Sequence, residues 1–357
     1  MDKILFITTV EFRRPYNGGT MYSNAIFRCL EQAFDVDVVV LKDHRIFQNP
    51  KLHALSSLIK GLISRVPLNV IFHSSGIRAL RYNPTNYKHI VVDHIEALGA
   101  INATDHPYVL IAHNLEYKLA TDKLRNRFTQ TLFQLSDRLR AYEYKGFANA
   151  KGVICISASE AAEISEVAHN VVQVLPSFPD RKLHNAKSEK IRFGFIGSAD
   201  WPPNARTVGK LVSAILPTAN RPMEFVLAGS GWADFGLNYS EQTRILGFVD
   251  DTKEFWENID YLLAPTEQGA GVNVKICEAL HFGVGVITNT ESAEAIFGTG
   301  ALPQNVFIAN TNKELEKLLN QIEPFETRVS HVEFSQTRMS DKLVAFLAAT
   351  GTGRSES

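Results

Sequence analysis

The residues that could do chemistry are concentrated between Pro265 and Gly285, where the sequence reads PTEQGAGVNVKICEALHFGVG. A glycine loop, Gly269 to Gly271, precedes a helical pattern in which Lys275 and Glu278 lie three residues apart. A glycine loop lets the backbone approach a phosphate closely, and a helix N-terminus presents N–H groups and a positive dipole end to an anion. A lysine for phosphate beside a carboxylate for a sugar diol is what a nucleotide-sugar pocket requires.

The same spacing has a plainer interpretation, which is a surface ion pair between Lys275 and Glu278. The surroundings favour the site, because Cys277, Ala279 and Leu280 make the helix mostly apolar and therefore packed. In a packed helix, the polar pair would lie near the loop end.

Two elements must position this pair. The apolar run from Tyr261 to Ala264 predicts a buried parallel strand that leads into the loop. Gly283 is placed to cap the C-terminus of a helix of about three turns. The pattern is therefore strand, glycine loop and helix.

Short apolar strand patterns alternate with longer helical patterns along the whole chain, which predicts parallel sheets with helices on both faces. We therefore predict an α/β protein of two doubly wound, Rossmann-like domains. The domains are expected at 1–176 and 191–335, with a polar linker at 177–190 and a C-terminal helix with a disordered tail at 336–357. The predicted strands are 3–10, 36–41, 90–92, 108–112, 153–156, 171–175, 192–197, 224–228, 244–246, 261–264, 286–289 and 306–309.

The motif GAGxxxKxxEALxxG, from Gly269 to Gly283, resembles the donor-binding signature of retaining glycosyltransferases with the GT-B fold, the large group 1 or family 4 class. The resemblance implies two Rossmann-like domains that face each other across a cleft, the first for the acceptor and the second for the nucleotide sugar. It implies that Glu278 holds the ribose. It also implies that the diphosphate is held by Lys275 and by the loop Gly269, Ala270, Gly271 and Val272.

Two positions depart from the family pattern. Ala270 stands where many members have a glutamate that touches the donor sugar, and the loop from Ser198 to Asn204 lacks the usual arginine and lysine. Asn204 is either a helix N-cap or a donor contact. Gly229 and Phe248, near later strand ends, resemble the family's nucleotide-base rim and are expected to bind the donor mostly through their backbone.

The first half offers a second set of candidates. His113 follows the strand 108–112, and ligands bind at the carboxyl ends of strands in such sheets. The family often has a histidine here that contacts the donor sugar, so we assign His113 a catalytic role beside Lys275 and Glu278. Gly18 and Gly19 form either a tight turn or a set of amides for the donor or acceptor. Weaker acceptor-binding candidates are Arg13, Arg14, His94 and Glu116.

The resemblance implies transfer of a hexosyl group from a nucleoside diphosphate sugar to a glycan or lipid-linked acceptor, with retention of configuration. The alternatives are a non-catalytic GT-B subunit that binds glycan or a partner transferase, and another GT-B enzyme such as a nucleotide-sugar epimerase or a phosphorylase. No cofactor and no metal are expected, because the helix dipole and Lys275 can stabilise the leaving group. The Asp35-x-Asp37 motif matches a metal motif of a different fold and is rejected as a site.

Composition limits the remaining possibilities. The 357 residues carry a net charge of -1, so no overall field attracts nucleic acid. No apolar run reaches about 18 residues, and Cys29, Cys155 and Cys277 lie in apolar patterns, which predicts a cytoplasmic protein with reduced core thiols. The apolar stripe 52–66 is a core helix or, alternatively, an interfacial helix. Together with the basic segment 118–145, the interfacial alternative predicts peripheral contact with the inner face of a membrane.

Overall fold

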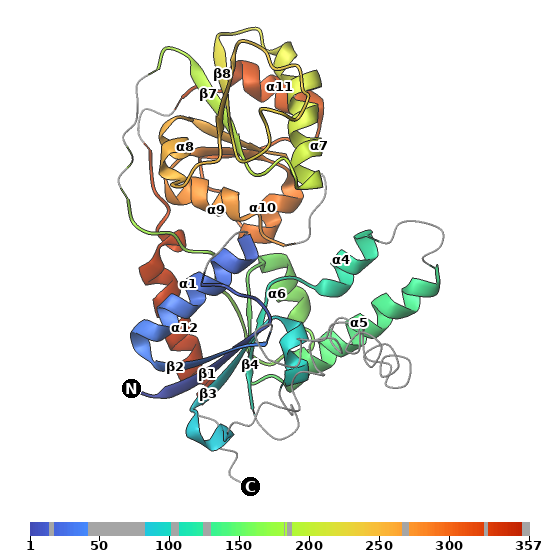
Figure 1. Ribbon diagram of the computed structural model, residues 1–357, viewed down its shortest axis with the longest axis vertical. Coiled ribbons are helices and arrows are strands. Elements are labelled where there is room, and N and C mark those ends of the chain that lie inside the picture. Colours follow the sequence, from blue (N-terminus) through green and yellow to red (C-terminus); the bar gives the residue numbers. More distant parts are fainter. Residues whose placement is uncertain are drawn as a thin grey trace. The chain divides into compact units, whose positions relative to one another are not determined.

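The computed structural model describes residues 1–13, 18–41, 83–100, 107–123, 130–181, 183, 188–265, 271–324 and 328–351, without the side chains of 100, 120–123 and 130–136. The chain divides into two compact units. Unit 1 comprises Met1–Pro176 and Gln336–Ser357, and unit 2 comprises Ser177–Ser335. Each unit is a parallel sheet flanked by helices (Figure 1).

Unit 1 is built on a sheet whose described strands have the order β2-β1-β3-β4-β5-β6, all parallel. Strands such as β3 and β4 are buried along their whole length, as expected for a sheet covered on both faces. The order reverses between β1 and β3, so this is the point where a ligand crevice is expected. The strands are β1 (Lys3–Thr8), β2 (Asp35–Val40), β3 (His89–Asp93), β4 (Val109–Ala112), β5 (Gly152–Cys155) and β6 (Val171–Gln173).

The C-terminal helix of unit 1 returns from the far end of the sequence. It packs against α1, and the two lie side by side in Figure 1. Met339, Leu343 and Leu347 are buried on this helix. The helices of unit 1 are α1 (Gly18–Ala33), α4 (Glu116–Lys123), α5 (Gln130–Asn149), α6 (Ala158–Ile164) and α12 (Gln336–Gly351), with 3-10 turns η4 (Pro84–Asn86) and η5 (Ile95–Ala100).

Unit 2 has the sheet order β12-β11-β10-β7-β8-β9, again parallel throughout. Its first strand, β7, lies between β8 and β10, which is the Rossmann arrangement with its switch point between β7 and β10. The strands are β7 (Ile191–Ile196), β8 (Met223–Ala228), β9 (Thr243–Gly247), β10 (Tyr261–Ala264), β11 (Gly285–Thr288) and β12 (Val306–Ile308).

The helices of unit 2 begin and end at recognisable residues. Pro202 begins α7 at its first turn, and Thr311 with Glu314 forms a capping box on α11. Gly283, with φ 69°, follows the end of α9 and confirms the predicted glycine cap. The helices are α7 (Pro202–Lys210), α8 (Lys253–Glu257), α9 (Val274–His281), α10 (Thr290–Phe297) and α11 (Asn312–Gln321), with a π turn η7 (Leu211–Ile215) and 3-10 turns η8 (Leu216–Thr218) and η9 (Val332–Phe334).

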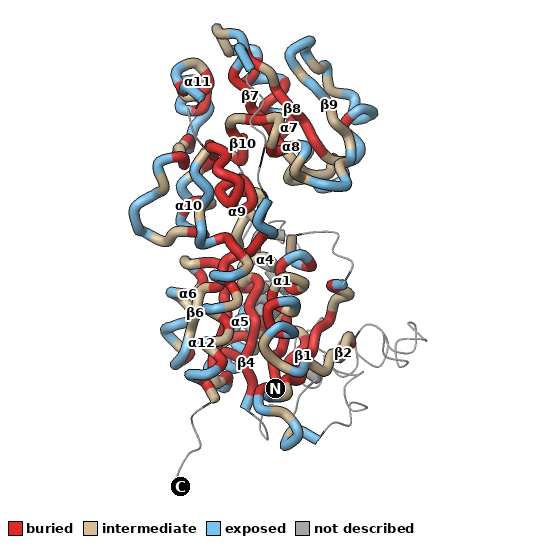
Figure 2. The backbone as a smooth tube through the Cα atoms, turned by 90° about the vertical axis from the view of Figure 1, so that its left-hand side faces the viewer, coloured by how far each residue is buried: buried red, intermediate tan, exposed pale blue. Residues whose placement is uncertain are grey.

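Each unit has its own apolar core. The buried residues of both cores come from the central strands and from the helices and loops that cover them, and Figure 2 shows the buried segments in red, whereas the edge strands β2 and β9 are more exposed. Cys29, Cys155 and Cys277 are buried in these cores as unpaired thiols. No helix in the described part of the chain is long and apolar enough to cross a membrane.

The predicted α/β class and all twelve predicted strands are confirmed, with ends shifted by one or two residues. The segment 177–190, predicted as a linker, is instead grouped with unit 2. There the Phe178 N–H donates to the Phe334 carbonyl over 3.0 Å, and the Pro179 carbonyl lies 3.1 Å from His281 Nε2. The apolar stripe 52–66 and the tail beyond residue 351 lie outside the described residues.

Candidate functional site

Lys275 lies beside the switch point of unit 2. Its Nζ is 4.0 Å from the ring centroid of Phe195, on β7, and donates to Asn204 Oδ1 over 3.3 Å. No carboxylate among the described residues pairs with this lysine, and burial lowers the pKa of Lys275 to about 7. A cation held this way is ready to accept an anion, because the anion would supply the charge partner that Lys275 lacks.

Asn204 was predicted as an N-cap or a donor contact, and the N-cap interpretation is wrong. Trp201 is the N-cap of α7 and Asn204 lies inside the first turn. The side chain of Asn204 joins the loop after β7 to Lys275, because its Nδ2 donates to the Ser198 carbonyl over 2.9 Å while its Oδ1 accepts from the lysine.

Glu278 lies one turn further along α9 and is 8% exposed. Its Oε1 accepts a hydrogen bond from Thr252 Oγ1, just before α8, and burial raises the pKa of its carboxyl group. The structure therefore gives Lys275 and Glu278 separate partners among the described residues, and the surface ion pair between them is absent there. Both residues lie within α9, Lys275 in its first turn and Glu278 near its middle.

The loop that precedes α9 is described only in part. Gly269 and Ala270 lie outside the described residues, whereas Gly271 has φ 89° and Val272 is half-buried. The N-cap of α9, Asn273, forms no side-chain cap with the helix.

Three strand ends of unit 2 approach each other through backbone. The N–H of Gly229 donates to the Gly247 carbonyl over 2.7 Å, and a Cβ on Gly229 would lie 2.1 Å from the Gly197 carbonyl oxygen. Only glycine fits at residue 229, which also has φ 123°. Phe248 follows Gly247 and its side chain is 73% exposed, so an aromatic face is available where the base rim was predicted.

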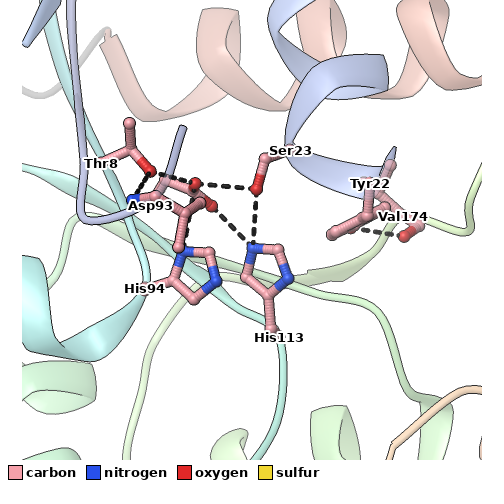
Figure 3. A network of polar contacts seen from close by, with 8 residues as sticks. Thr8, Tyr22, Ser23, Asp93, His94, His113 and Val174 are labelled. Atoms are coloured by element: carbon pink, nitrogen blue, oxygen red, sulfur yellow. Dashed lines mark hydrogen bonds and ion pairs between the residues drawn. The ribbon is translucent and has the colours of Figure 1, made fainter. Parts of the chain in front are cut away.

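The candidates of unit 1 gather around a buried carboxylate at its switch point. His113 follows β4, and its Nε2 lies 2.7 Å from Oδ1 of Asp93, the last residue of β3 (Figure 3). His94 Nδ1 lies 3.1 Å from Asp93 Oδ2, and the rings of His94 and His113 stack with centroids 3.8 Å apart. His94 and His113 were both predicted as site residues, and the structure brings them together around Asp93.

The other predicted residues of unit 1 are dispersed. Gly18 and Gly19 begin α1, and Glu116 begins α4, where its N–H donates to Glu143 Oε1 over 2.7 Å. Arg13 lies over the Phe12 ring at 5.6 Å. Arg14 lies outside the described residues.

Two basic side chains of the predicted basic segment 118–145 make contacts within unit 1. Lys118 pairs with Glu163, and the Arg140 guanidinium lies 4.9 Å from the Tyr144 ring centroid.

A metal ion bound near His94 and His113 would have to compete for the carboxylate of Asp93. Among the described residues, Asp93, His94 and His113 are the one group with three possible ligand atoms within 4.8 Å of each other. Both oxygens of Asp93 already accept hydrogen bonds. Asp37, of the rejected Asp-x-Asp motif, is engaged by Lys3 at 2.9 Å and by the Tyr87 hydroxyl at 2.6 Å.

Sequence reasoning missed the partners of these side chains. Thr252 precedes an ordinary helix, and the N-cap interpretation of Asn204, one of the two predicted for it, overlooked Pro202, which marks the start of α7. Asp93 is twenty residues from His113, and the signal that joins them is that Asp93 ends β3 and His113 follows β4, its parallel neighbour.

Comparison with known proteins identifies the fold. Residues 190–324 match the family model described as glycosyl transferases group 1. Sucrose-phosphate synthase from Thermosynechococcus elongatus has a similar structure, with a TM-score of 0.62 and 12% identity over 98% of this chain and 99% of that chain. HepE from Anabaena, solved in complex with UDP, gives a TM-score of 0.61 and 15% identity over 97% of this chain and 100% of that chain.

A third structure is longer than this chain. TarM gives a TM-score of 0.54 and 10% identity over 78% of this chain, which spans 58% of the length of TarM. No curated protein matches the sequence. The two parallel six-stranded sheets and these structural neighbours show that the chain has the GT-B fold, and residues 190–324, in its second unit, are similar to the group 1 glycosyl transferases.

Proposed function

We propose that the chain transfers a hexosyl group from a nucleoside diphosphate sugar to a glycan or lipid-linked acceptor, with retention of configuration. The observation that carries the proposal is Lys275, a half-buried cation without an acidic partner among the described residues, at the switch point of a Rossmann sheet. Charge grows on the leaving diphosphate as the anomeric bond breaks, and Lys275 with the first turn of α9 would stabilise that charge.

The remaining parts of the site divide the work of recognition. Glu278 would accept the ribose hydroxyls, and Phe248 with the turns at Gly229 and Gly247 would form the rim for the base. His113, which stacks on His94 in unit 1, would recognise the sugar. Because HepE was solved with UDP, we propose uridine diphosphate sugars as the first donors to test.

A donor screen with the full chain tests this proposal. We expect one nucleoside diphosphate to raise the melting temperature through binding to the folded state, and one of its hexose conjugates to be slowly hydrolysed. Binding without any hydrolysis or transfer would favour the non-catalytic subunit. Interconversion of two nucleotide sugars would favour an epimerase.

We also propose that the reaction needs no metal, since Lys275 and the α9 N-terminus would supply the positive charge that a metal would otherwise bring to the leaving group. Turnover is then expected to be unchanged by a chelator. A lipid-linked acceptor would bring the chain to a membrane surface, and sedimentation with anionic vesicles that decreases with salt would distinguish that acceptor from a soluble glycan.

A further inference from the structure

The side chain of Asn204 fills the space that Gly197 leaves open at the end of β7. Gly197 directly follows β7 and has φ 151°, and a Cβ on it would lie 2.5 Å from Asn204 Nδ2. The backbone of Gly197 is held on both sides. Its N–H donates to the Ala228 carbonyl over 2.9 Å, and its carbonyl accepts from Trp232 Nε1 over 2.7 Å. The amide of Asn204 therefore lies against a fixed backbone.

The orientation of the Asn204 amide follows from its two hydrogen bonds. Its Nδ2 donates to the Ser198 carbonyl over 2.9 Å, and its Oδ1 accepts from Lys275 Nζ over 3.3 Å. The reverse orientation would place an oxygen against a carbonyl oxygen and an N–H donor against an ammonium group, so both contacts require the observed one. One side chain thus joins the loop after β7 to the first turn of α9.

The groups that surround the Lys275 ammonium are neutral. Its Nζ lies 4.0 Å from the Phe195 ring centroid and donates to the Asn204 amide. Glu278, on the same helix, is bonded to Thr252 instead. Burial lowers the pKa of Lys275 to about 7, and no acidic group in the described part of the chain opposes that effect. A carboxylate in place of the Asn204 amide would neutralise the lysine, whereas the amide leaves its charge for a ligand.

We propose that Asn204 is a positioning residue, which holds the Lys275 ammonium between β7 and the first turn of α9 and, because it is a neutral amide, leaves that charge for an anion. The inference rests on the proposed function, in which the anion is the diphosphate of the nucleotide. The residues that it requires all lie in unit 2. It also gives a reason for glycine at residue 197, since a larger residue there would displace the amide.

NMR of the full chain labelled with ¹³C and ¹⁵N lysine tests the role of the neutral amide without any nucleotide. The Lys275 signals can be assigned with Lys275→Met. We expect Asn204→Asp to raise the pKa of Lys275 by roughly one to three pH units, because a neighbouring carboxylate favours the charged form. Asn258→Leu is the matched control. It removes another amide-to-carbonyl hydrogen bond of unit 2, to Glu254, and should leave the pKa of Lys275 unchanged.

Kinetics with the donor identified by the screen test the positioning of the lysine. Asn204→Leu should lower kcat by roughly 10-fold to 100-fold, the effect of losing one hydrogen bond to a charged group, with a smaller change in KM. The loss falls on kcat because charge grows on the diphosphate in the transition state. Asn258→Leu should keep the wild-type kcat. Asn204→Ala supplies a second variant if leucine prevents folding.

Gly197→Ala tests the same link from the other side. Residue 197 has no hydrogen bond to Lys275, yet a Cβ on it would push the Asn204 amide away, so a folded Gly197→Ala protein should show the loss of kcat seen in Asn204→Leu.

An unchanged pKa of Lys275 in Asn204→Asp would overturn this inference, and so would a wild-type kcat in the Asn204→Leu and Asn204→Ala proteins. The proposed function fails in a different way. The expected rise in the pKa of Lys275, in a full chain that binds no nucleoside diphosphate, would support Asn204 as the positioning residue and contradict the proposed function.

Discussion

Lys275 combines a cation–ring contact with an amide hydrogen bond, and neither neutralises its charge. Such a lysine loses its proton more readily than one in water, and burial is the cause of its lowered pKa, about 7. A bound diphosphate would reverse that effect by supplying negative charge. Nucleotide binding and the protonation of Lys275 are therefore expected to be coupled.

We predict that the affinity for the nucleoside diphosphate falls as the pH rises above about 7, because binding must then supply a proton to Lys275. Calorimetry at pH 8 in buffers of different ionisation enthalpy should detect that proton uptake. Lys275→Met should remove it and reduce turnover by roughly 100-fold to 1000-fold, the range for the loss of one transition-state donor. Lys210→Met, at the end of α7, is the control and should keep the uptake.

Glu278 is expected to act on binding of the nucleotide itself. If its carboxylate accepts both ribose hydroxyls, Glu278→Gln should weaken nucleoside diphosphate binding by about 1.5–3 kcal/mol, the range for hydrogen bonds to a charged group. Calorimetry with the matching 2′-deoxy nucleotide provides the control, since the variant should discriminate less between the two. Unchanged affinity would make Glu278 a structural partner of Thr252.

At the scale of elements, the loop after β4 is held by buried carboxylates from two helices. Glu143, on α5, accepts from the N–H groups of Glu116 and Tyr117 over 2.7 and 3.0 Å, and Glu160, on α6, accepts from Leu115 N–H over 3.0 Å. These three amides belong to the start of α4, directly after His113. The carboxylates therefore fix the backbone that presents the histidine.

Glu143 makes the stability of unit 1 depend on pH. Burial raises the pKa of Glu143 to about 8, although its two amide donors act in the opposite direction. Its ordinary value is about 4.3, so its contribution to stability is present below that pH and is lost as the pH rises through about 8. We predict that the melting temperature of the wild type falls between pH 6 and 8.5 more than that of Glu143→Gln.

The control for this comparison is Glu163→Gln, because Glu163 is half-buried in the same unit and its pKa is lowered instead, by Lys118, Tyr117 and Tyr144, despite partial burial. Equal slopes for the wild type and Glu143→Gln would mean that the two amides keep Glu143 ionised in the folded protein.

The strands could be read from the sequence because buried parallel strands are continuous apolar runs, such as Tyr261–Ala264. The C-terminus of α9 could be predicted because Gly283, which has a left-handed backbone, directly follows the C-cap. The amide partners of Glu143 and Glu160 could not be predicted from the sequence. A glutamate inside a helix gives no sign of which backbone N–H groups it will reach after packing. Asn204 shows the same limit: its neighbour Lys275 is 71 residues away.

At the scale of the whole molecule, the chain enters and leaves unit 2 at one place. Phe178 and Ser335 form a parallel bridge, so the two crossings between the units run side by side. The core of unit 2 lies within residues 191–322. Asn204, Thr252, Lys275 and Glu278 all lie in the same unit. Unit 1, by contrast, is discontinuous in sequence, since α12 returns to pack on α1.

This asymmetry leads to a prediction about fragments. Residues 177–335 alone should fold and bind the nucleoside diphosphate with the affinity of the full chain, because the proposed nucleotide contacts are contained in them. Residues 1–176 should be unstable, because they lack the buried Leu343 and Leu347 of α12. Burial of each such side chain contributes about 1.5–3 kcal/mol. Thermal melts followed by circular dichroism and titration calorimetry measure the two properties.

The matched control is a fragment in which residues 1–176 are joined to 336–351 by a flexible linker, which should restore cooperative melting. An unstable 177–335 fragment would contradict the division into units. A folded 177–335 fragment that binds no nucleotide, from a full chain that does, would show that unit 1 also contributes to the nucleotide site. Folding and binding together would assign the nucleotide to unit 2.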